Sequence, residues 1–96
     1  MKLSILIPVY NEQETIGEIL RQVRAVELEG IEREIIAVDD CSTDSTTEIL
    51  QQEARQSDTF VFTHERNQGK GAAVRTALEH ATGVLDEQNV AGSVLK

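Results

Sequence analysis

Three short segments carry the side chains of this sequence that could do chemistry. Tyr10 offers a flat ring on which a nucleobase could stack, and Glu12 and Asp40 are carboxylates that could accept hydrogen bonds from base or ribose groups. Gly69-Lys70-Gly71 stands where a helix is expected to begin, so free backbone N–H groups and the lysine ammonium could meet a phosphate. Together these groups suit a nucleotide that carries a diphosphate.

Each segment also has a purely structural explanation. Pro8 is of the kind that ends a strand, and Asn11-Glu12 at a helix start is typical of a cap. Paired acids such as Asp39-Asp40 are frequently solvated loop residues. Gly69-Lys70-Gly71 lacks the Gly-Lys-Ser/Thr ending of an NTPase phosphate loop and the third glycine of a dinucleotide fingerprint. The functional interpretation therefore depends on three separate loops meeting at one edge of a sheet.

Residue types that bind metals or act as nucleophiles are few. His64 and His80 are expected at the surface, because they are too far apart in sequence to form a metal pair without further ligands. Cys41 is expected to be a small, partly buried side chain, since no histidine lies close to it in sequence. These residues predict neither a metal site nor a catalytic nucleophile.

Three apolar runs predict the strands that would position the loops. Leu3 to Val9 and Glu34 to Val38 are short and rich in β-forming residues, as strands buried in a sheet are, and Thr59 to Thr63 is a third strand. The first run is closed by Tyr10-Asn11. The second ends abruptly at Asp39-Asp40.

Apolar side chains at steps of three and four predict three helices. The first extends from about Gln13 to Glu27. The second can begin near Ser45, whose hydroxyl would cap it together with Glu48 in a capping box. The third carries an apolar stripe that consists of Val74, Ala77, Leu78 and Ala81.

The order of these elements, β-α-β-α-β-α, predicts the α/β class. Parallel strands joined by right-handed crossovers place helices on both faces of the sheet, and ligands bind beyond the carboxyl ends of the strands. Beyond residue 83 neither period fits the sequence. We therefore expect one ordered unit over residues 1–83 and a divergent tail of uncertain structure over residues 84–96.

Length and charge exclude several classes of protein. The chain has 96 residues and a formal net charge of −8, so it has room for one small domain, and its excess of acid argues against a general nucleic-acid binder. One cysteine cannot form an internal disulfide, which favours a reducing compartment. No apolar run approaches the roughly 18–20 residues needed to cross a bilayer, so we expect a cytoplasmic protein.

Four motifs stand in order along the chain. They are Ile7-Pro8-Val9-Tyr10-Asn11-Glu12, Ile36-Ala37-Val38-Asp39-Asp40-Cys41-Ser42-Thr43-Asp44, Arg66-Asn67-Gln68-Gly69-Lys70-Gly71-Ala72-Ala73 and Ala81-Thr82-Gly83. In order and spacing they resemble the amino-terminal half of family 2 glycosyltransferases. The likeness covers about residues 2–83. It is closest to the branch that includes dolichol-phosphate mannosyltransferase and bacterial polyprenyl-phosphate sugar transferases.

The resemblance implies a Rossmann-like, partial A-type glycosyltransferase domain that binds the nucleotide of a UDP- or GDP-sugar. Its implied nucleotide-binding residues are Pro8, Tyr10, Glu12, Val38, Asp39, Asp40, Gly69, Lys70 and Gly71. The first three would wall the base and ribose, Val38 and Asp40 would contact the base, and Asp39 is a weaker candidate. The glycine and lysine turn would lie near the diphosphate. Cys41 stands where the family usually has glycine, which would strain the turn if that position needs a positive φ.

The chain departs from the family after Gly83. The family continues into a fourth strand that ends in an Asp-x-Asp motif holding Mg²⁺ or Mn²⁺, and then into an acceptor half with the catalytic base. Residues 84–89 show no such strand, and no Asp-x-Asp occurs in the chain. Because the metal offsets charge on the leaving diphosphate, transfer should be very slow without it. We therefore expect a truncated donor-binding half that is inactive alone, without metal ligands or catalytic residues.

Two further classes of function are considered. A non-catalytic nucleotide-binding or interaction module on the same fold is favoured by the missing Asp-x-Asp. A receiver-like signalling domain fits poorly, because it needs an acidic pair after the first strand and a phosphoacceptor Asp after the third, where this chain has Thr63-His64-Glu65. Relatives that act on lipid carriers work at the membrane face, so a peripheral location is also implied.

The missing strand would have a structural consequence. In the family the first strand is flanked by the second strand and the fourth. Without a true fourth strand, Ser4 to Val9 would keep an open edge, which is a hazard for pairing between chains. We predict that Val90 to Leu95 covers this edge poorly, or that two chains associate across it.

Overall fold

The computed structural model describes residues 2–27, 29–81 and 84–85, the last two as backbone. Its elements are β1 (Lys2–Val9), α1 (Ile16–Ala25), β2 (Glu32–Asp39), α2 (Thr46–Glu53), β3 (Thr59–Thr63), α3 (Lys70–His80) and β4 (Val84–Leu85). Strands and helices alternate along the chain, as the hydrophobic periodicity predicts, and the α/β class is confirmed. In the described part of the chain, no helix is long and apolar enough to cross a membrane.

The sheet has the strand order β3-β2-β1-β4, and every neighbouring pair is parallel. The predicted absence of a strand after Gly83 is wrong for Val84 and Leu85, which pair with Leu3 and Ser4 of β1. Two residues are too few to show a hydrophobic pattern in the sequence, so β4 is recognised only by its pairing with β1. The predicted covering segment from Val90 to Leu95 lies outside the described residues.

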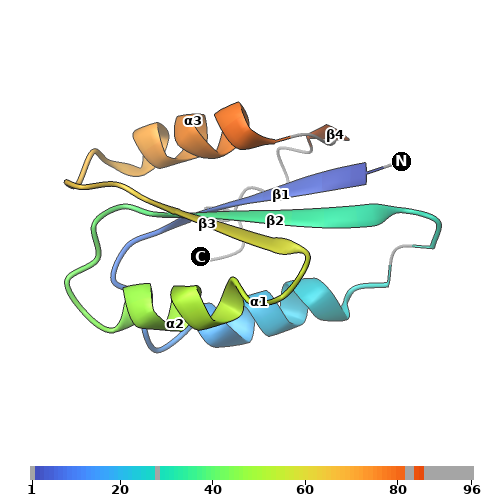
Figure 1. Ribbon diagram of the computed structural model, residues 1–96, viewed down its shortest axis with the longest axis horizontal. Helices are drawn as coiled ribbons and strands as arrows, with labels where there is room; N and C mark the ends of the chain where they lie inside the picture. The colour runs from blue at the N-terminus through green and yellow to red at the C-terminus, as the bar shows by residue number, and fades with distance from the viewer. Residues whose placement is uncertain (1, 28, 82–83, 86–96) are drawn as a thin grey trace.

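Helices cover both faces of the sheet, as expected for this class. In Figure 1, α3 lies over one face, and α1 and α2 lie over the other. The face under α1 and α2 holds the larger apolar cluster, which includes Ile7, Ile35 and Leu20, each at most 1% exposed. Burying such a side chain contributes about 1.5–3 kcal/mol. The two predicted buried strands, β1 and β2, are confirmed, whereas β3 is only partly buried, with Phe60 47% exposed.

The apolar stripe of α3 differs from the one predicted. Ala73 and Ala77 pack on the sheet, next to Leu6 and Ile36, whereas Leu78 is 41% exposed. Alanine at these two positions lets the helix approach the sheet closely, and Leu78 then falls beyond the contact face. Hydrophobicity alone assigned Leu78 to the stripe, because the sequence does not show how near the helix lies to the sheet.

The predicted capping box at Ser45 is wrong. Ser45 makes no side-chain cap, and the Thr46 N–H instead donates to Asp44 Oδ1 at 2.9 Å. The Ser45 N–H donates to Gln13 Oε1 of the preceding loop at 2.9 Å. Contacts between loops, which a local rule does not consider, thus decide how α2 begins.

Candidate functional site

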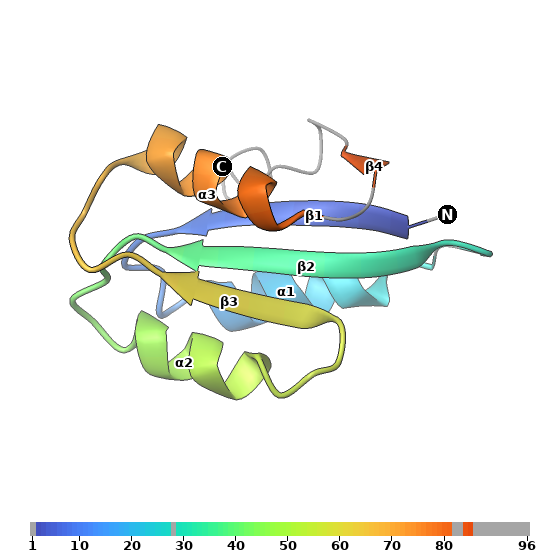
Figure 2. The same cartoon turned by 45° about the horizontal axis from the view of Figure 1, so that its top comes forward.

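The carboxyl ends of β1, β2 and β3 meet at one edge of the sheet, where their arrowheads lie together in Figure 2. The loops after β1 and β2 are joined directly. Asn11 N–H donates to Ser42 Oγ at 3.0 Å, and Thr43 N–H donates to Asn11 Oδ1 at 2.8 Å. Asn11 has a φ of +48°, a conformation that asparagine tolerates better than most residues. The predicted meeting of these two loops is confirmed.

Asp40 joins the loop after β2 to the start of α3. Its Oδ1 accepts hydrogen bonds from His64 Nδ1 and Gln68 N–H, and its Oδ2 accepts one from Gly69 N–H, each at 2.8 Å. Its side chain is only 5% exposed. Burial pushes the pKa of Asp40 upward, but the hydrogen bonds from Gln68, His64 and Gly69 outweigh it and leave the pKa below its ordinary value. Asp40 is therefore a buried carboxylate that holds the loop before α3.

The first turn of α3 presents unused hydrogen-bond donors. Gly69 is the N-cap with a φ of +91°, which glycine adopts without strain. The N–H groups of the three residues that follow, Lys70, Gly71 and Ala72, have no acceptor within the helix. This turn contains no acidic residue and begins with Lys70. The turn is thus electropositive through its N–H groups, the helix dipole and an ammonium.

Three cations in the loop before α3 and in α3 itself have no acidic partner among the described residues. Arg66, Lys70 and Arg75 form no ion pair with any residue in the described ranges, although the protein carries a net charge of −8. The Arg75 guanidinium returns over the first turn, with Nη1 3.6 Å from where a Cβ on Gly71 would be. Unpaired cations beside an open helix start suit a phosphate group.

The structure divides the sequence-predicted residues by exposure. Tyr10 is 46% exposed, Lys70 and Gly71 are also exposed, and Glu12 and Gly69 are partly buried. The buried ones are Pro8, Val38, Asp39 and Asp40. An exposed residue can touch a ligand directly, whereas a buried one contributes mainly by holding the backbone.

Asp39 is fully buried, and its contacts are internal. Its Oδ1 accepts a hydrogen bond from Ser42 N–H at 3.0 Å, and its Oδ2 accepts one from Thr47 Oγ1 at 2.5 Å. These contacts fold the loop after β2 back against α2. Asp39 and Asp40 are thus both buried and hydrogen-bonded within the protein, rather than the solvated pair that composition alone would favour.

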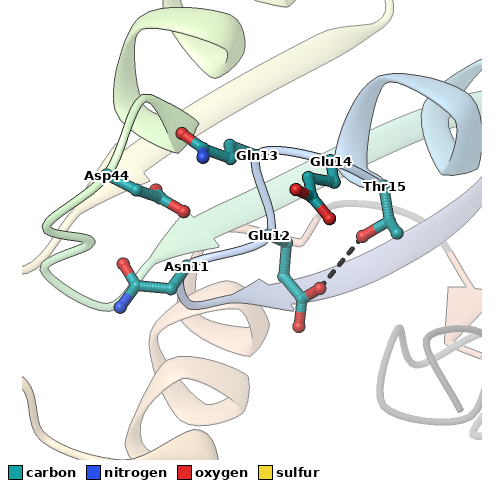
Figure 3. Close-up of a pocket in the computed structure, with 6 residues that line it drawn as sticks. All are labelled: Asn11, Glu12, Gln13, Glu14, Thr15 and Asp44. Atoms are coloured by element: carbon teal, nitrogen blue, oxygen red, sulfur yellow. Dashed lines mark hydrogen bonds between the residues drawn. The ribbon is translucent and has the colours of Figure 1, made fainter.

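A hollow of about 250 Å³ lies beside the joined loops (Figure 3), and its lining consists of Asn11, Glu12, Gln13, Glu14, Thr15 and Asp44. Glu12 points toward Thr15 there and accepts a hydrogen bond from its hydroxyl at 3.0 Å. Three of the lining side chains are carboxylic acids, which would repel a phosphate. The phosphate-compatible surface is therefore the start of α3, and this hollow suits neutral or hydrogen-bond-donating groups.

The described side chains offer few ligands for a metal ion. Across residues 2–27, 29–81 and 84–85, no group of three or more His, Cys, Asp or Glu residues is arranged to hold one. The carboxylate of Asp40 is already occupied by three donors. These residues do not fit the divalent metal that the family resemblance implies, so no step is assigned to a metal here.

His64 is the main residue that sequence reasoning missed. It was expected at the surface, but its side chain is 9% exposed and bonds Asp40 through Nδ1 and Thr76 Oγ1 through Nε2, each at 2.8 Å. The prediction fails because it considered only metal ligation. The sequence did contain one indication of this contact. His64 directly follows β3, and a parallel sheet places that position beside the end of β2, where Asp40 lies. His80 is exposed, as predicted, and stacks on Phe62.

Cys41 adopts the left-handed conformation that the resemblance led us to suspect, with a φ of +62°. A residue with a Cβ loses about 1 kcal/mol there relative to glycine. We expect Cys41→Gly to raise the free energy of unfolding by about 1 kcal/mol and the Tm by roughly 4–8 °C. Urea and thermal unfolding measure both quantities.

The matched control for this prediction is Cys41→Ala. Alanine keeps the Cβ and removes the thiol, which donates to Glu65 O at 3.5 Å. No stabilisation is expected from this variant. An equal gain from alanine and glycine would show that the thiol, rather than the backbone, is the source of strain.

A parallel sheet covered on both faces, with loops that meet at its carboxyl edge beside a helix start, defines a Rossmann-like, doubly wound α/β architecture. Residues 4–85 match the model of the family described as Glycosyl transferase family 2. The chain belongs to this family, and the resemblance noted in the sequence is confirmed.

Relatives and solved structures agree with this assignment. The undecaprenyl-phosphate 4-deoxy-4-formamido-L-arabinose transferase of Salmonella paratyphi A is 37% identical over 87 residues, which are 88% of this chain and 27% of that enzyme. S. aureus TarS 1–349 in complex with UDP superposes with a TM-score of 0.77 at 32% identity, over 90% of this chain and 27% of TarS 1–349. Mannosyltransferase PcManGT from Pyrobaculum calidifontis, in complex with GDP-Man and Mn²⁺, superposes with a TM-score of 0.72 at 29% identity, over 84% and 24% of the two chains. This chain therefore spans only a minor part of each longer protein.

Proposed function

We propose that residues 1–83 form a unit that binds the nucleoside diphosphate of a nucleotide-sugar donor, UDP- or GDP-linked. The observation that carries the proposal is the start of α3, where Lys70 is exposed with no acidic partner among the described residues and the first-turn N–H groups have no acceptor within the helix. The solved neighbours in complex with UDP and with GDP-Man support this ligand class.

Within this site, exposure separates direct contacts from supporting ones. Tyr10 stacks on the base, and Glu12 accepts hydrogen bonds from ribose or base groups. Lys70 and Gly71 contact the diphosphate, and Arg75 is placed to contact it as well. The buried members, which are Pro8, Val38, Asp39 and Asp40, hold these groups in place, together with the partly buried turn at Gly69.

We propose that the described residues contribute donor binding and not the transfer step. They contain no Asp-x-Asp motif, and the described side chains do not fit a metal ion. By analogy with the undecaprenyl-phosphate transferase, we propose that the acceptor is a polyprenyl phosphate. A cytoplasmic location, peripheral to the membrane that holds such a lipid, is part of the same proposal.

Isothermal titration with UDP and with GDP tests the proposal. We expect one of the two to bind at least tenfold more tightly than its parent nucleoside in buffer with EDTA, because the start of α3 contacts the diphosphate. Equal affinity for nucleoside and diphosphate would contradict it. Absence of any binding would leave the second function, an interaction module on this fold, as the better interpretation. A parallel titration with Mn²⁺ measures any contribution from a metal.

We also propose that the chain associates with itself through β1. Among the described residues, β4 pairs only with Leu3 and Ser4, which leaves the outer edge of β1 from Ile5 to Val9 without a strand partner. Unpaired backbone N–H and C=O groups on an apolar strand favour pairing with another chain. Sedimentation velocity should show a concentration-dependent dimer. A monodisperse monomer with slow amide exchange from Ile5 to Ile7 would contradict this proposal.

A further inference from the structure

His64 lies between two side chains that come from different elements. Its Nδ1 lies 2.8 Å from Asp40 Oδ1, and its Nε2 lies 2.8 Å from Thr76 Oγ1 in the middle of α3. The carboxylate of Asp40 only accepts hydrogen bonds, so Nδ1 must carry the proton. In the neutral ring Nε2 then accepts from the Thr76 hydroxyl, and the ring orientation is fixed at both nitrogens.

The same carboxylate determines where α3 begins. Asp40 accepts the Gly69 N–H at 2.8 Å and the Gln68 N–H at 2.8 Å, and α3 starts at the next residue. We call Thr76, His64, Asp40 and Gly69 the Asp40 network. It connects the middle of α3 to its own first turn through the ends of β2 and β3.

We propose that His64 is a positioning residue for the diphosphate subsite, acting through Asp40 to fix the first-turn N–H groups of α3. This inference rests on the proposed function. A diphosphate needs several donors at defined positions, and a site loses affinity when its supporting hydrogen bonds are loosened. The direct contacts of His64 are with Asp40 and Thr76, and its side chain is 9% exposed, so it acts through these partners.

Two variants of His64 separate its two contacts. In His64→Asn the amide nitrogen takes the place of Nδ1 and keeps the donor to Asp40. In His64→Gln the amide takes the place of Nε2, which keeps the contact with Thr76 and removes the donor to Asp40. For each variant we compare the affinity for UDP or GDP, whichever binds more tightly, with the affinity for its parent nucleoside. Binding is followed by NMR titration.

We expect His64→Gln to bind the diphosphate about tenfold more weakly and the nucleoside within about twofold of the wild type. His64→Asn should keep the wild-type preference for the diphosphate within about threefold. A purely structural role would weaken both ligands together, or would affect both variants equally. Ile49→Ala is the stability control, because Ile49 packs against the core cluster on the other face of the sheet.

Thr76 supplies a second test if His64→Gln does not fold. Thr76→Val removes the hydroxyl at nearly constant shape, whereas Thr76→Ser keeps it. Amide exchange of Gly69 should accelerate about threefold or more in Thr76→Val and stay unchanged in Thr76→Ser, since its N–H donates to Asp40. Unchanged exchange in both variants would overturn the inference. If the wild-type protein bound the diphosphate no more tightly than the parent nucleoside, the proposed function itself would be overturned.

Discussion

Replacing Asp40 with alanine is expected to lower the free energy of unfolding by about 3 kcal/mol and to abolish measurable preference for a nucleoside diphosphate. The variant leaves the Gln68 and Gly69 N–H groups and the His64 ring without their shared acceptor. Buried donors without a partner carry the full cost of lost solvation. For a domain of this size, whose total stability is typically about 5–15 kcal/mol, that loss is large. Urea unfolding measures it.

The same carboxylate gives the prediction a pH dependence. Hydrogen bonds hold the pKa of Asp40 below its ordinary value of 3.8, so the group contributes stability that is fully present above that value. This stability is lost as the pH falls through the lower pKa of the folded protein. The difference in unfolding free energy between the wild type and Asp40→Ala should therefore be constant near neutral pH and shrink below about pH 4.

Asp44→Ala is the matched control for Asp40→Ala. Asp44 also accepts a backbone N–H, that of Thr46, and its pKa is also lowered, but it is less buried, and its hydrogen bonds lie at the starts of α1 and α2 rather than at the start of α3. We expect a smaller loss of stability and an unchanged preference for the diphosphate. If the two variants lost the same free energy of unfolding, the position of Asp40 between three loops would not explain the stability it contributes.

Lys70→Met is expected to weaken binding of UDP or GDP by about tenfold at low salt, with a smaller effect at high salt. The ammonium stands at the start of α3, where a phosphate would meet both it and the first-turn N–H groups. The same substitution should leave stability unchanged or slightly higher, because a cation at a helix N-terminus opposes the helix dipole. Titration calorimetry measures the weaker binding, and thermal unfolding measures the unchanged or higher stability.

Arg55→Met is the charge-matched control for Lys70→Met. Arg55 is exposed just beyond α2, which covers the other face of the sheet from α3 (Figure 1). Both variants remove one positive charge from a protein of net charge −8. If Arg55→Met weakened binding as much as Lys70→Met, the effect would reflect net charge, and the phosphate contact at Lys70 would be refuted.

Strand positions were predictable from the sequence because the signal is local. β3 has the predicted bounds, and β1 and β2 differ from the prediction by one or two residues at their ends. A strand buried on both faces must be apolar along its length, whatever lies beside it. The motif residues at the carboxyl edge could be found in the same way, since an α/β order predicts where those ends meet.

Other features depend on residues that are distant in sequence. Asp40 and His64 are joined across 24 residues, and β4 is visible only because β1 lies beside it. His64 was assigned to the surface because it has no metal-binding partner nearby in sequence, a criterion that does not consider contacts between distant segments.

The sequence by itself determined the order of the elements and the residues that reach the carboxyl edge, because local patterning dictates which segments are strands and helices. The tertiary structure alone decided which of those residues face solvent and which are consumed as internal acceptors. Burial and hydrogen-bond geometry arise only when separate loops are packed together. That is why Lys70 is exposed to a ligand, whereas Asp40 is buried and accepts three internal hydrogen bonds.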